Sequence, residues 1–264
     1  MIDKRNPIGA IDSGVGGLTV VRELQRLLPG EDIVYFGDSA NCPYGNKTGE
    51  QIFQLGRNML TFLSTHHVKC VAVACNTLSS MVGRLRPCFD FHIVSIVEEA
   101  AKYMAESGLS SVGLIGTEFT VAAGKYDELI HQLNPDCRII SKGSPLLSGL
   151  VDRGDFNQRE INLEITTQVD HILAREAVDH LILGCTHYPI VTENFRACYP
   201  DLELIDPAYE QAKAVKAYLE ANDALNPQET GSLCVYTSGD PKIYADVARR
   251  LSLSPISRAE TVQL

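Results

Sequence analysis

The sequence lacks any run of apolar residues long enough to cross a lipid bilayer, and its first residues lack the apolar core of a secretory signal peptide. We therefore expect the protein to lie in the cytosol. The sequence also lacks a Cys-x-x-Cys pair, although it contains 8 cysteines. This absence argues against zinc ribbons and thioredoxin-type redox sites, and a cytosolic location predicts free thiols rather than a disulfide framework.

Positive charge is scarce in this chain. Lysine and arginine together number 23 against 33 aspartates and glutamates, which gives the 264 residues a formal net charge of -10. This balance argues against nucleic acid or an anionic membrane as a main partner. It does not exclude an anionic small molecule, because backbone N–H groups close to a ligand can outweigh a distant field. The length suffices for one large α/β domain or for two lobes.

Low-complexity tracts and blocks of like charge are also absent, and short apolar runs alternate with segments of helical periodicity. The runs are unbroken and rich in Val, Ile and Leu, which is typical of a parallel sheet covered on both faces. The expected strands are Ile8–Ile11, Ile33–Phe36, Cys70–Ala74, His92–Ile96, Ser111–Ile115, Arg138–Ser141, His180–Leu183, Leu202–Ile205 and Leu233–Thr237. The expected helices are Leu18–Leu28, Glu50–Thr65, Val97–Ser107, Ala123–Leu133, Arg159–Glu176, Val191–Cys198 and Tyr209–Ala221.

Two pairs of segments resemble each other at similar separations along the chain. Val71–Thr77 is similar to Leu181–His187, since each is an apolar strand followed by a small residue, a cysteine and a polar turn. Ile8–Gly14 is similar to Val112–Thr117. These similarities favour an old duplication that produced two pseudo-symmetric lobes, although any two α/β strands can look alike.

The expected boundary between the lobes falls near Val97, where a strand gives way to Glu98-Glu99. We expect residues 1–97 and 207–264 to form the first lobe and residues 98–206 to form the second. Each lobe is expected to be a mostly parallel sheet flanked by helices, with the active site in the cleft between them.

Cys75 and Cys185 each come directly after an expected strand. Ligands of open parallel sheets bind at the carboxyl ends of the strands, so two facing lobes would place these cysteines on opposite sides of one cleft. Such a pair suits a reaction that removes a proton from one face of a carbon and returns one to the other face. A free cysteine has a pKa of about 8.5, so the site must also stabilise the negative charge that develops on a weakly acidic substrate.

Donors for such a charge follow several expected strands. Ser13–Gly17, Asn76-Thr77 and Thr186-His187 open helices, whose free N–H groups attract anions. Side-chain hydroxyl groups add further donors: Ser13, Thr77, Thr120 and Thr186.

The protonation states of the two cysteines need neighbouring groups that tune them. Asp12 could act near Cys75, and His187 could act near Cys185. Two further carboxylates are candidate partners: Asp38 and Asp152.

Each of these motifs also has a structural interpretation. Asp12–Gly14 could be a helix cap, His187 a loop histidine, and Pro43–Gly45 a plain turn. The remaining cysteines are expected to be packing residues. They are Cys42, Cys70, Cys88, Cys137, Cys198 and Cys234.

Taken together, the motifs resemble those of the glutamate racemase family, within the wider aspartate/glutamate racemase superfamily. The matching segments appear in family order over most of residues 8–206. They are Ile11–Val20, Tyr35–Asp38, Pro43–Gly45, Ala74–Thr77, Gly116-Thr117 with Thr120 and Tyr126, and Leu183–Pro189.

The resemblance implies two pseudo-symmetric α/β lobes with the active site between them, and no pyridoxal phosphate, metal or nucleotide. It implies that Cys75 takes the proton from D-glutamate with the help of Asp12, and that Cys185 takes it from L-glutamate with the help of His187. It also implies a bacterial source that uses D-glutamate in peptidoglycan, and it leaves a homodimer as a candidate assembly. The residues implied to hold the substrate are Ser13, Pro43, Tyr44, Gly45, Asn76, Thr77, Thr120 and Thr186.

The sequence departs from the family pattern at two places. Ser95–Ala101 replaces a Gly-Val-x-x-Pro-Gly-Ala stretch, which bears on the lobe junction, on dimer contacts and on regulation. Asp152 stands where the family usually has a glutamate. The shorter carboxylate is expected to reach His187 only through water, and thereby to alter catalysis on the second face or the packing of the lobes.

Other functions stay open at this point. The nearest alternative is a racemase of aspartate or of several amino acids. A cysteine hydrolase with His187 as base would leave one cysteine without a role, and a two-lobe binding protein would bind without proton exchange. A dinucleotide site at Gly14-x-Gly16 is disfavoured because Thr19 replaces the third glycine. Lys142 superficially resembles a pyridoxal lysine but is expected to end a strand.

Overall fold

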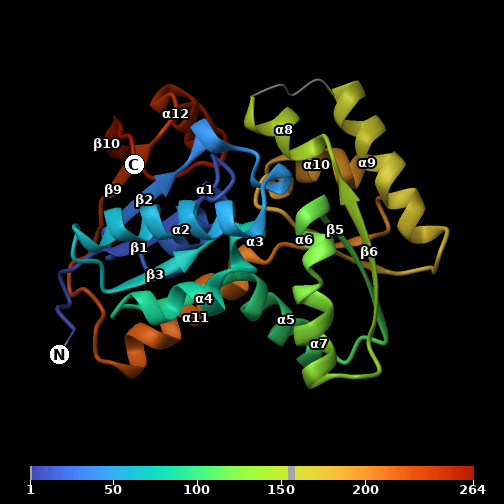
Figure 1. Ribbon diagram of the computed structural model, residues 1–264, viewed down its shortest axis with the longest axis horizontal. Helices are drawn as coiled ribbons and strands as arrows, with labels where there is room; N and C mark the ends of the chain where they lie inside the picture. The colour runs from blue at the N-terminus through green and yellow to red at the C-terminus, as the bar shows by residue number, and fades with distance from the viewer. Residues whose placement is uncertain (1, 154–157) are drawn as a thin grey trace.

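The computed structural model describes residues 2–153 and 158–264, which form two parallel sheets flanked by helices (Figure 1). The strands are β1 (Ile8–Asp12), β2 (Ile33–Gly37), β3 (Cys70–Val73), β4 (His92–Ser95), β5 (Ser111–Thr117), β6 (Arg138–Ser144), β7 (His180–Gly184), β8 (Glu203–Ile205), β9 (Leu233–Thr237) and β10 (Ile256–Thr261). The six-stranded sheet has the order β10-β9-β2-β1-β3-β4, and the four-stranded sheet has the order β6-β5-β7-β8. The expected α/β class is therefore confirmed.

The helices lie between the strands in sequence, as the expected alternation requires. The α-helices are α1 (Leu18–Leu27), α2 (Gly49–Ser64), α3 (Asn76–Ser79), α4 (Val82–Leu85), α5 (Ile96–Glu106), α6 (Glu118–Ala123), α7 (Lys125–Leu133), α8 (Leu147–Asp152), α9 (Gln158–Leu173), α10 (Thr192–Cys198), α11 (Ala208–Ala221) and α12 (Pro241–Arg250). Short 3-10 helices are η1 (Ser39–Asn41), η2 (Tyr44–Asn46), η3 (Arg86–Cys88) and η4 (Tyr188–Val191). Within the described ranges, no helix combines the length and hydropathy needed to cross a membrane.

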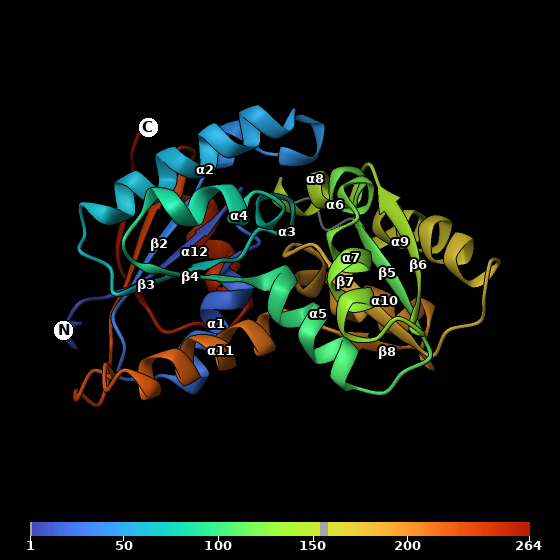
Figure 2. The same ribbon diagram turned by 60° about the horizontal axis from the view of Figure 1, so that its bottom comes forward.

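The six-stranded sheet is covered on both faces, which explains its unbroken apolar strands. Helix α2 lies over one face, and α1 and α11 lie over the opposite face (Figure 2). Ile11 packs in the cluster on the α2 face, whereas Ala10 belongs to the cluster on the α1 face. Adjacent residues of β1 thus point to opposite sides, and all five residues of β1 are buried.

The two sheets share one strand pattern. In the order β2-β1-β3-β4, strand β1 lies between β2 and β3, and β4 lies outside β3. In the order β6-β5-β7-β8, strand β5 likewise lies between β6 and β7, and β8 lies outside β7. Strands β3 and β7 therefore occupy equivalent places, as do β1 and β5. This equivalence is what a duplication predicts for the paired sequence segments.

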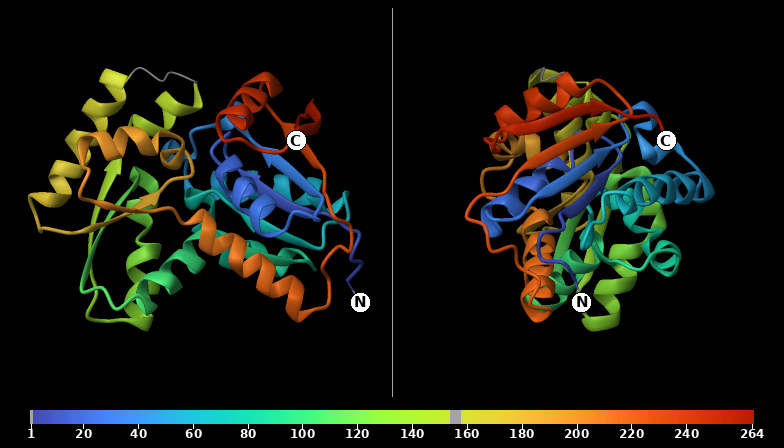
Figure 3. Two further views of the ribbon diagram at one scale, coloured as in Figure 1. Left: turned by 180° about the vertical axis from the view of Figure 1, so that it is seen from behind. Right: turned by 90° about the vertical axis from the view of Figure 1, so that its left-hand side faces the viewer.

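The chain crosses between the sheets twice. Helix α5 follows β4 directly and packs against α7 and α11. After β8, the chain passes through α11 to β9 and β10, which extend the first sheet beyond β2 (Figure 3). Both chain ends lie beside the six-stranded sheet (Figures 1 and 3).

Each expected strand and helix forms, but the structure adds elements and moves several boundaries by one to three residues; for example, β6 extends to Ser144 and α9 ends at Leu173. Strand β10 and helix α12 were not expected. The helix expected over Ala123–Leu133 starts only at Lys125, because Gly124 has a φ of 62° and ends α6 in the left-handed region. The atypical Ser95–Ala101 stretch forms the end of β4 and the start of α5, where the Ser95 hydroxyl accepts a hydrogen bond from the Glu98 N–H at 3.4 Å.

Candidate active site

Cys75 and Cys185 lie at the carboxyl ends of β3 and β7, and both line one small, partly open pocket. The loops after strands of both sheets supply its walls, as expected for ligand sites of parallel sheets. The lining residues are Ser13, Cys42, Pro43, Tyr44, Gly45, Cys75, Asn76, Thr77, Thr117, Ser148, Cys185, Thr186 and His187. In the described part of the chain, all 8 cysteines are free thiols.

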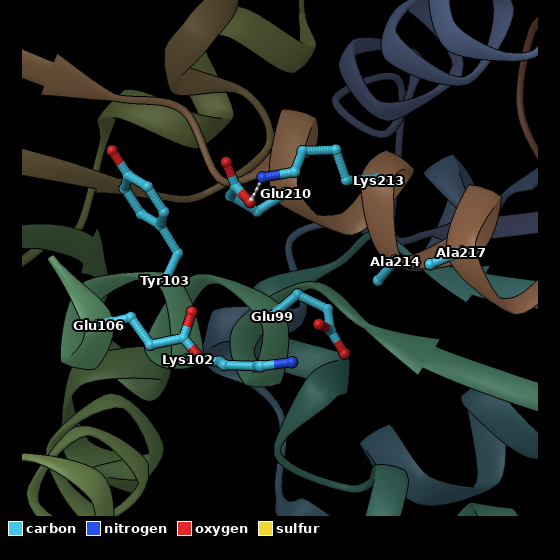
Figure 4. Close-up of a pocket in the computed structure, with 8 residues that line it drawn as sticks. All are labelled: Glu99, Lys102, Tyr103, Glu106, Glu210, Lys213, Ala214 and Ala217. Atoms are coloured by element: carbon cyan, nitrogen blue, oxygen red, sulfur yellow. Dashed lines mark hydrogen bonds and ion pairs between the residues drawn. The ribbon is translucent and has the colours of Figure 1, made fainter.

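A larger groove of about 800 Å³ lies outside this pocket, between α5 and α11 (Figure 4). Its charged groups include Glu210 and Lys213, which form an ion pair at 2.7 Å. The remaining described residues that line it are Glu99, Lys102, Tyr103, Glu106, Ala214 and Ala217, none of them a cysteine or histidine. The chemistry that the sequence indicates therefore belongs to the small pocket.

Cys75 caps helix α3, so that its sulfur faces the free N–H groups of the first helical turn. Its Sγ accepts a hydrogen bond from the Leu78 N–H at 3.5 Å and lies 3.5 Å from Ser13 Oγ. Burial raises the pKa of the Cys75 thiol to about 12, and the charge of Asp12 adds to this rise. Cys75 is therefore held as a thiol, with donors in place for a transient thiolate.

Asp12 ends β1 and is completely buried. Its carboxylate accepts hydrogen bonds at 3.0 Å from the Gly14 N–H and at 3.0 Å from the Thr186 hydroxyl. Burial raises its pKa from 3.8 to about 6, although the nearby His187 works in the opposite direction. Asp12 thus joins the two lobes and influences Cys75 through its charge.

A chain of polar contacts leads away from Cys185. Its Sγ lies 3.6 Å from His187 Nδ1, and His187 Nε2 lies 3.1 Å from Asp152 Oδ1. The same Asp152 oxygen accepts a hydrogen bond from the Val15 N–H at 3.3 Å. The expectation that Asp152 reaches His187 only through water is wrong, because α8 brings its carboxylate close enough for a direct hydrogen bond.

This direct contact sets the charges of both partners. Burial alone would lower the pKa of His187, but its hydrogen bonds with Asp152 and Cys185 outweigh burial and raise the pKa well above 6.5. Burial would likewise raise the pKa of Asp152, but the hydrogen bond and charge of His187 lower it. The geometry therefore favours an imidazolium between a carboxylate and the Cys185 sulfur.

Asn76 presents an unused donor to the pocket. Its Oδ1 accepts a hydrogen bond from the Tyr126 hydroxyl at 2.7 Å, which fixes the amide. Its Nδ2 is buried and has no partner among the residues that the structure describes. A buried N–H without an acceptor is costly, so this side chain suits a bound ligand with an acceptor oxygen.

Three threonine hydroxyls form a triangle beside Asn76. Thr77 Oγ1 lies 3.0 Å from Thr117 Oγ1 and 3.2 Å from Thr120 Oγ1, and the latter two are 2.9 Å apart. Thr77 and Thr117 line the pocket, whereas Thr120 is not among the described lining residues. Thr120 is thus placed to orient the other two hydroxyls.

Pro43, Tyr44 and Gly45 form another wall of the pocket. The Tyr44 hydroxyl donates a hydrogen bond to Asp38 Oδ2 at 2.6 Å. Asp38 Oδ1 also accepts from the Ser238 hydroxyl at 2.6 Å, so the C-terminal segment helps to fix this wall. Asp38 therefore holds Tyr44 in place. The described residues that line the pocket do not include Asp38, Asp12 or Asp152.

The sequence predicted no site role for three lining residues, Cys42, Thr117 and Ser148, although Thr117 belongs to a family motif. Cys42 was expected to be a packing residue, but it lines the pocket and precedes the Pro43–Gly45 motif. Ser148 lies one helical turn before Asp152 on α8, so the i, i+4 spacing could have indicated it.

Two cofactor sites considered from the sequence do not fit the geometry. A Cβ added at Gly16 would lie 2.4 Å from Thr186 Oγ1, so the second lobe fills the space that a dinucleotide pyrophosphate would need. Lys142 lies within β6 and does not belong to the described pocket lining. One group could hold a metal ion, since Cys42, Asp152 and His187 bring ligand atoms within 4.8 Å of one another.

Comparisons with known proteins agree over nearly the whole chain. The model of a family described as Asp/Glu/Hydantoin racemase matches residues 8–215. A glutamate racemase of Thermus thermophilus is 38% identical over 252 residues, which cover 95% of this chain and 94% of that protein. A glutamate racemase of Limosilactobacillus reuteri is 34% identical over 243 residues, or 91% of this chain and 90% of that protein.

Solved structures give the same result. Glutamate racemase from Thermus thermophilus in complex with β-chloro-D-alanine superposes with a TM-score of 0.86 at 37% identity, covering 99% of this chain and 98% of that one. Glutamate racemase from Francisella tularensis in complex with D-glutamate has a TM-score of 0.90 at 30% identity, covering 98% of each chain. The chain therefore belongs to the Asp/Glu/Hydantoin racemase family.

Proposed function

We propose that the protein interconverts L-glutamate and D-glutamate without a cofactor, with Cys75 and Cys185 as its two acid–base groups. The observation that carries this proposal is that the two sulfurs follow equivalent strands of the two sheets and line the same pocket. Neither a hydrolase nor a binding protein needs two such thiols. Glutamate is the substrate named for relatives that match over nine-tenths of the chain, and one solved relative holds D-glutamate.

The proposed reaction removes one proton from the α-carbon and adds another proton to its opposite face. With D-glutamate bound, the Cys75 thiolate takes the α-proton, and the electron pair of the C–H bond spreads into the substrate carboxylate. The Cys185 thiol then gives its proton to the opposite face, which yields L-glutamate. The reverse reaction uses Cys185 as base and Cys75 as acid.

The remaining site residues stabilise charge and hold the substrate. Asp12 assists Cys75, and His187 assists Cys185 with Asp152 behind it. The free Nδ2 of Asn76 supplies a donor for a substrate oxygen, and a fixed donor of this kind contributes about 3–4 kcal/mol in acyl-transfer enzymes. We assign the other substrate contacts to Ser13, Pro43, Tyr44, Gly45, Thr77 and Thr186, with Thr120 and Asp38 orienting their neighbours.

The organisation around this chemistry is also proposed. Residues 1–97 with 207–264 form one lobe and residues 98–206 form the other, which is supported by β9 and β10 extending the first sheet. We further propose a cytosolic enzyme that supplies D-glutamate for peptidoglycan. A homodimer stays a prediction that sedimentation analysis would test.

Heavy water tests the two-base mechanism directly. Each glutamate enantiomer is incubated with the wild type, Cys75→Ala and Cys185→Ala, and both inversion and α-deuteration are followed by NMR. Both variants should lose racemisation by roughly 10²–10⁴-fold, because each lacks one of two acid–base groups. A single variant with full activity would contradict the assignment.

The same assay separates the alternative functions. An amino-acid panel distinguishes glutamate from aspartate or broad specificity, and preference for aspartate would overturn the substrate assignment. A cysteine hydrolase would form a covalent acyl-enzyme, whereas a binding protein would leave the α-proton unexchanged.

A further inference from the structure

Three side chains meet at one edge of the pocket, and the proposed proton transfer gives one of them, Cys42, no role. Cys42 lies in the loop after β2, Asp152 ends α8, and His187 follows β7. Their ligand atoms lie within 4.8 Å of one another. We propose that Cys42, Asp152 and His187 form a Zn²⁺ site at which the metal inhibits the enzyme rather than serving as its cofactor.

The donor set is the kind that Zn²⁺ prefers. A thiolate, an imidazole nitrogen and a carboxylate oxygen are its usual protein ligands, and three such ligands leave a fourth position open. Zinc–ligand bonds of about 2.0–2.3 Å place ligand atoms roughly 3–4 Å apart in a tetrahedron. His187 Nε2 and Asp152 Oδ1 are already 3.1 Å apart, so a small approach of Cys42 completes the set.

The ligands also have the outer contacts that zinc ligands need. His187 Nδ1 faces Cys185 Sγ at 3.6 Å, which holds the ring with Nε2 toward Asp152. The Val15 N–H holds the Asp152 carboxylate at 3.3 Å. Such partners orient a ligand before the metal arrives.

The cation can reach this position from solvent. The Asp152 side chain is 17% exposed and Cys42 is partly exposed, whereas the His187 side chain is only 2% exposed. The site is therefore open on the Cys42 and Asp152 side and closed on the Cys185 side.

Inhibition follows from which atoms the metal would occupy, and this part of the inference rests on the proposed function. Zn²⁺ at Nε2 takes the place of the proton that His187 shares with Asp152. The chain of contacts Cys185–His187–Asp152 is then broken between His187 and Asp152, so the partner of the second cysteine is no longer held by the Asp152 carboxylate. Cys42 and His187 both line the pocket, so an ion that they hold would also compete with a substrate carboxylate for space there.

Metal binding is measured first, without reference to activity. Zn²⁺ is titrated into the metal-free full chain against a chromophoric chelator, and Co²⁺ absorbance reports thiolate ligation. We expect one tight site per chain, with a sulfur-to-cobalt charge-transfer band. Cys42→Ser should weaken binding by more than about 100-fold, because losing a ligand exceeds the effect of losing an outer partner. His187→Gln should do the same.

Cys88→Ser is the matched control, because Cys88 is an exposed free thiol outside the pocket. It should bind Zn²⁺ like the wild type. Absence of stoichiometric binding, or equal affinity in wild type and Cys42→Ser, would overturn the site. Tight binding without inhibition of wild-type racemisation would overturn the inhibitory role. Racemisation in the presence of chelator tests the proposed function separately, so the two failures are distinguishable.

Discussion

The two sides of the pocket have the same fold and different chemistry. Cys75 and Cys185 each follow the third strand of an equivalent four-strand set. Cys75 has neutral hydrogen-bond partners: its thiol donates to the Ser13 hydroxyl oxygen, and its sulfur accepts from the Leu78 N–H. Cys185 instead has His187 and, behind it, the Asp152 carboxylate. The two sides therefore share the positions of the sulfurs but not the groups that tune them.

The carboxylates on the two sides, Asp12 and Asp152, also differ in how favourable their ionised forms are in the folded state. Asp12 is completely buried, and burial raises its pKa to about 6, so its ionised form is unfavourable in the folded state. Asp152 is more exposed and bonds to His187, which lowers its pKa. The first side thus holds a destabilising charge, and the second holds a compensated pair.

The largest expected effect comes from His187→Gln, which removes the cation beside Cys185. Racemisation should fall by roughly 10²–10⁴-fold, the usual contribution of a positioned acid–base group. Because enantiomers have equal free energies, kcat/KM must fall by the same factor in both directions. The difference between the two sides instead appears in the kinetic isotope effects on racemisation. These effects should increase most when the substrate is α-deuterated L-glutamate, whose proton Cys185 removes.

A second histidine provides the control for this variant. His180 begins the same strand, β7, at its opposite end and pairs with Glu203 at 3.2 Å. His180→Gln should leave racemisation unchanged. Equal isotope effects for both enantiomers in His187→Gln would contradict the assignment of His187 to the Cys185 side.

The next prediction concerns the free energy of unfolding, which the buried charge of Asp12 lowers. The unfolded chain releases this proton near pH 3.8, whereas the folded state retains it to about pH 6, so stability falls as pH rises through this window. Asp12→Asn should therefore raise the free energy of unfolding at pH 7 by about 2–3 kcal/mol while impairing racemisation. Urea unfolding at pH 7 and at about pH 3 measures this, and the gain should vanish at the lower pH. Destabilisation at pH 7 would show that its hydrogen bonds outweigh burial.

The sequence predicted the sheets and the cysteine positions for a physical reason. A buried parallel strand needs an unbroken apolar run, and the residue after it must lie at the ligand-binding edge. Cys75 and Cys185 are such residues, and the confirmed α/β class follows from the same pattern. The family motifs then indicated Asp12, Asn76 and His187, which structure alone would not have ranked by role.

The contacts that the sequence did not predict all depend on how separate segments meet. The Asp152–His187 distance depends on the position of α8, and the Asn76–Tyr126 bond joins α3 to α7. The position of Cys42 is set by the loop after β2, and the sequence of this loop has no helix or strand periodicity from which its path could be predicted. Strand β10 was missed because its Ile256–Thr261 segment is polar and mostly exposed at a sheet edge.

The smallest effect separates the charge of Asp152 from its length. Asp152→Asn removes the carboxylate that outweighs burial, so the pKa of His187 should fall, and activity that needs the imidazolium should be lost at lower pH than in wild type. Losing a hydrogen bond between charged groups costs about 1.5–3 kcal/mol, which predicts a tenfold to hundredfold loss of racemisation. NMR titration of His187 and a pH–rate profile measure both changes.

Asp152→Glu is the matched variant, because it keeps the charge and restores the residue usual in the family. A Cβ added at Gly14 would lie 2.4 Å from Asp152 Oδ1, so a longer side chain has to shift against this backbone. We expect the pKa of His187 to stay raised while the ratio of kcat for the two directions changes. If Asp152→Glu has wild-type kcat in both directions, the shorter carboxylate does not contribute to the difference between the two sides. If Asp152→Asn keeps the high pKa of His187, the imidazolium on the Cys185 side does not depend on Asp152 at all.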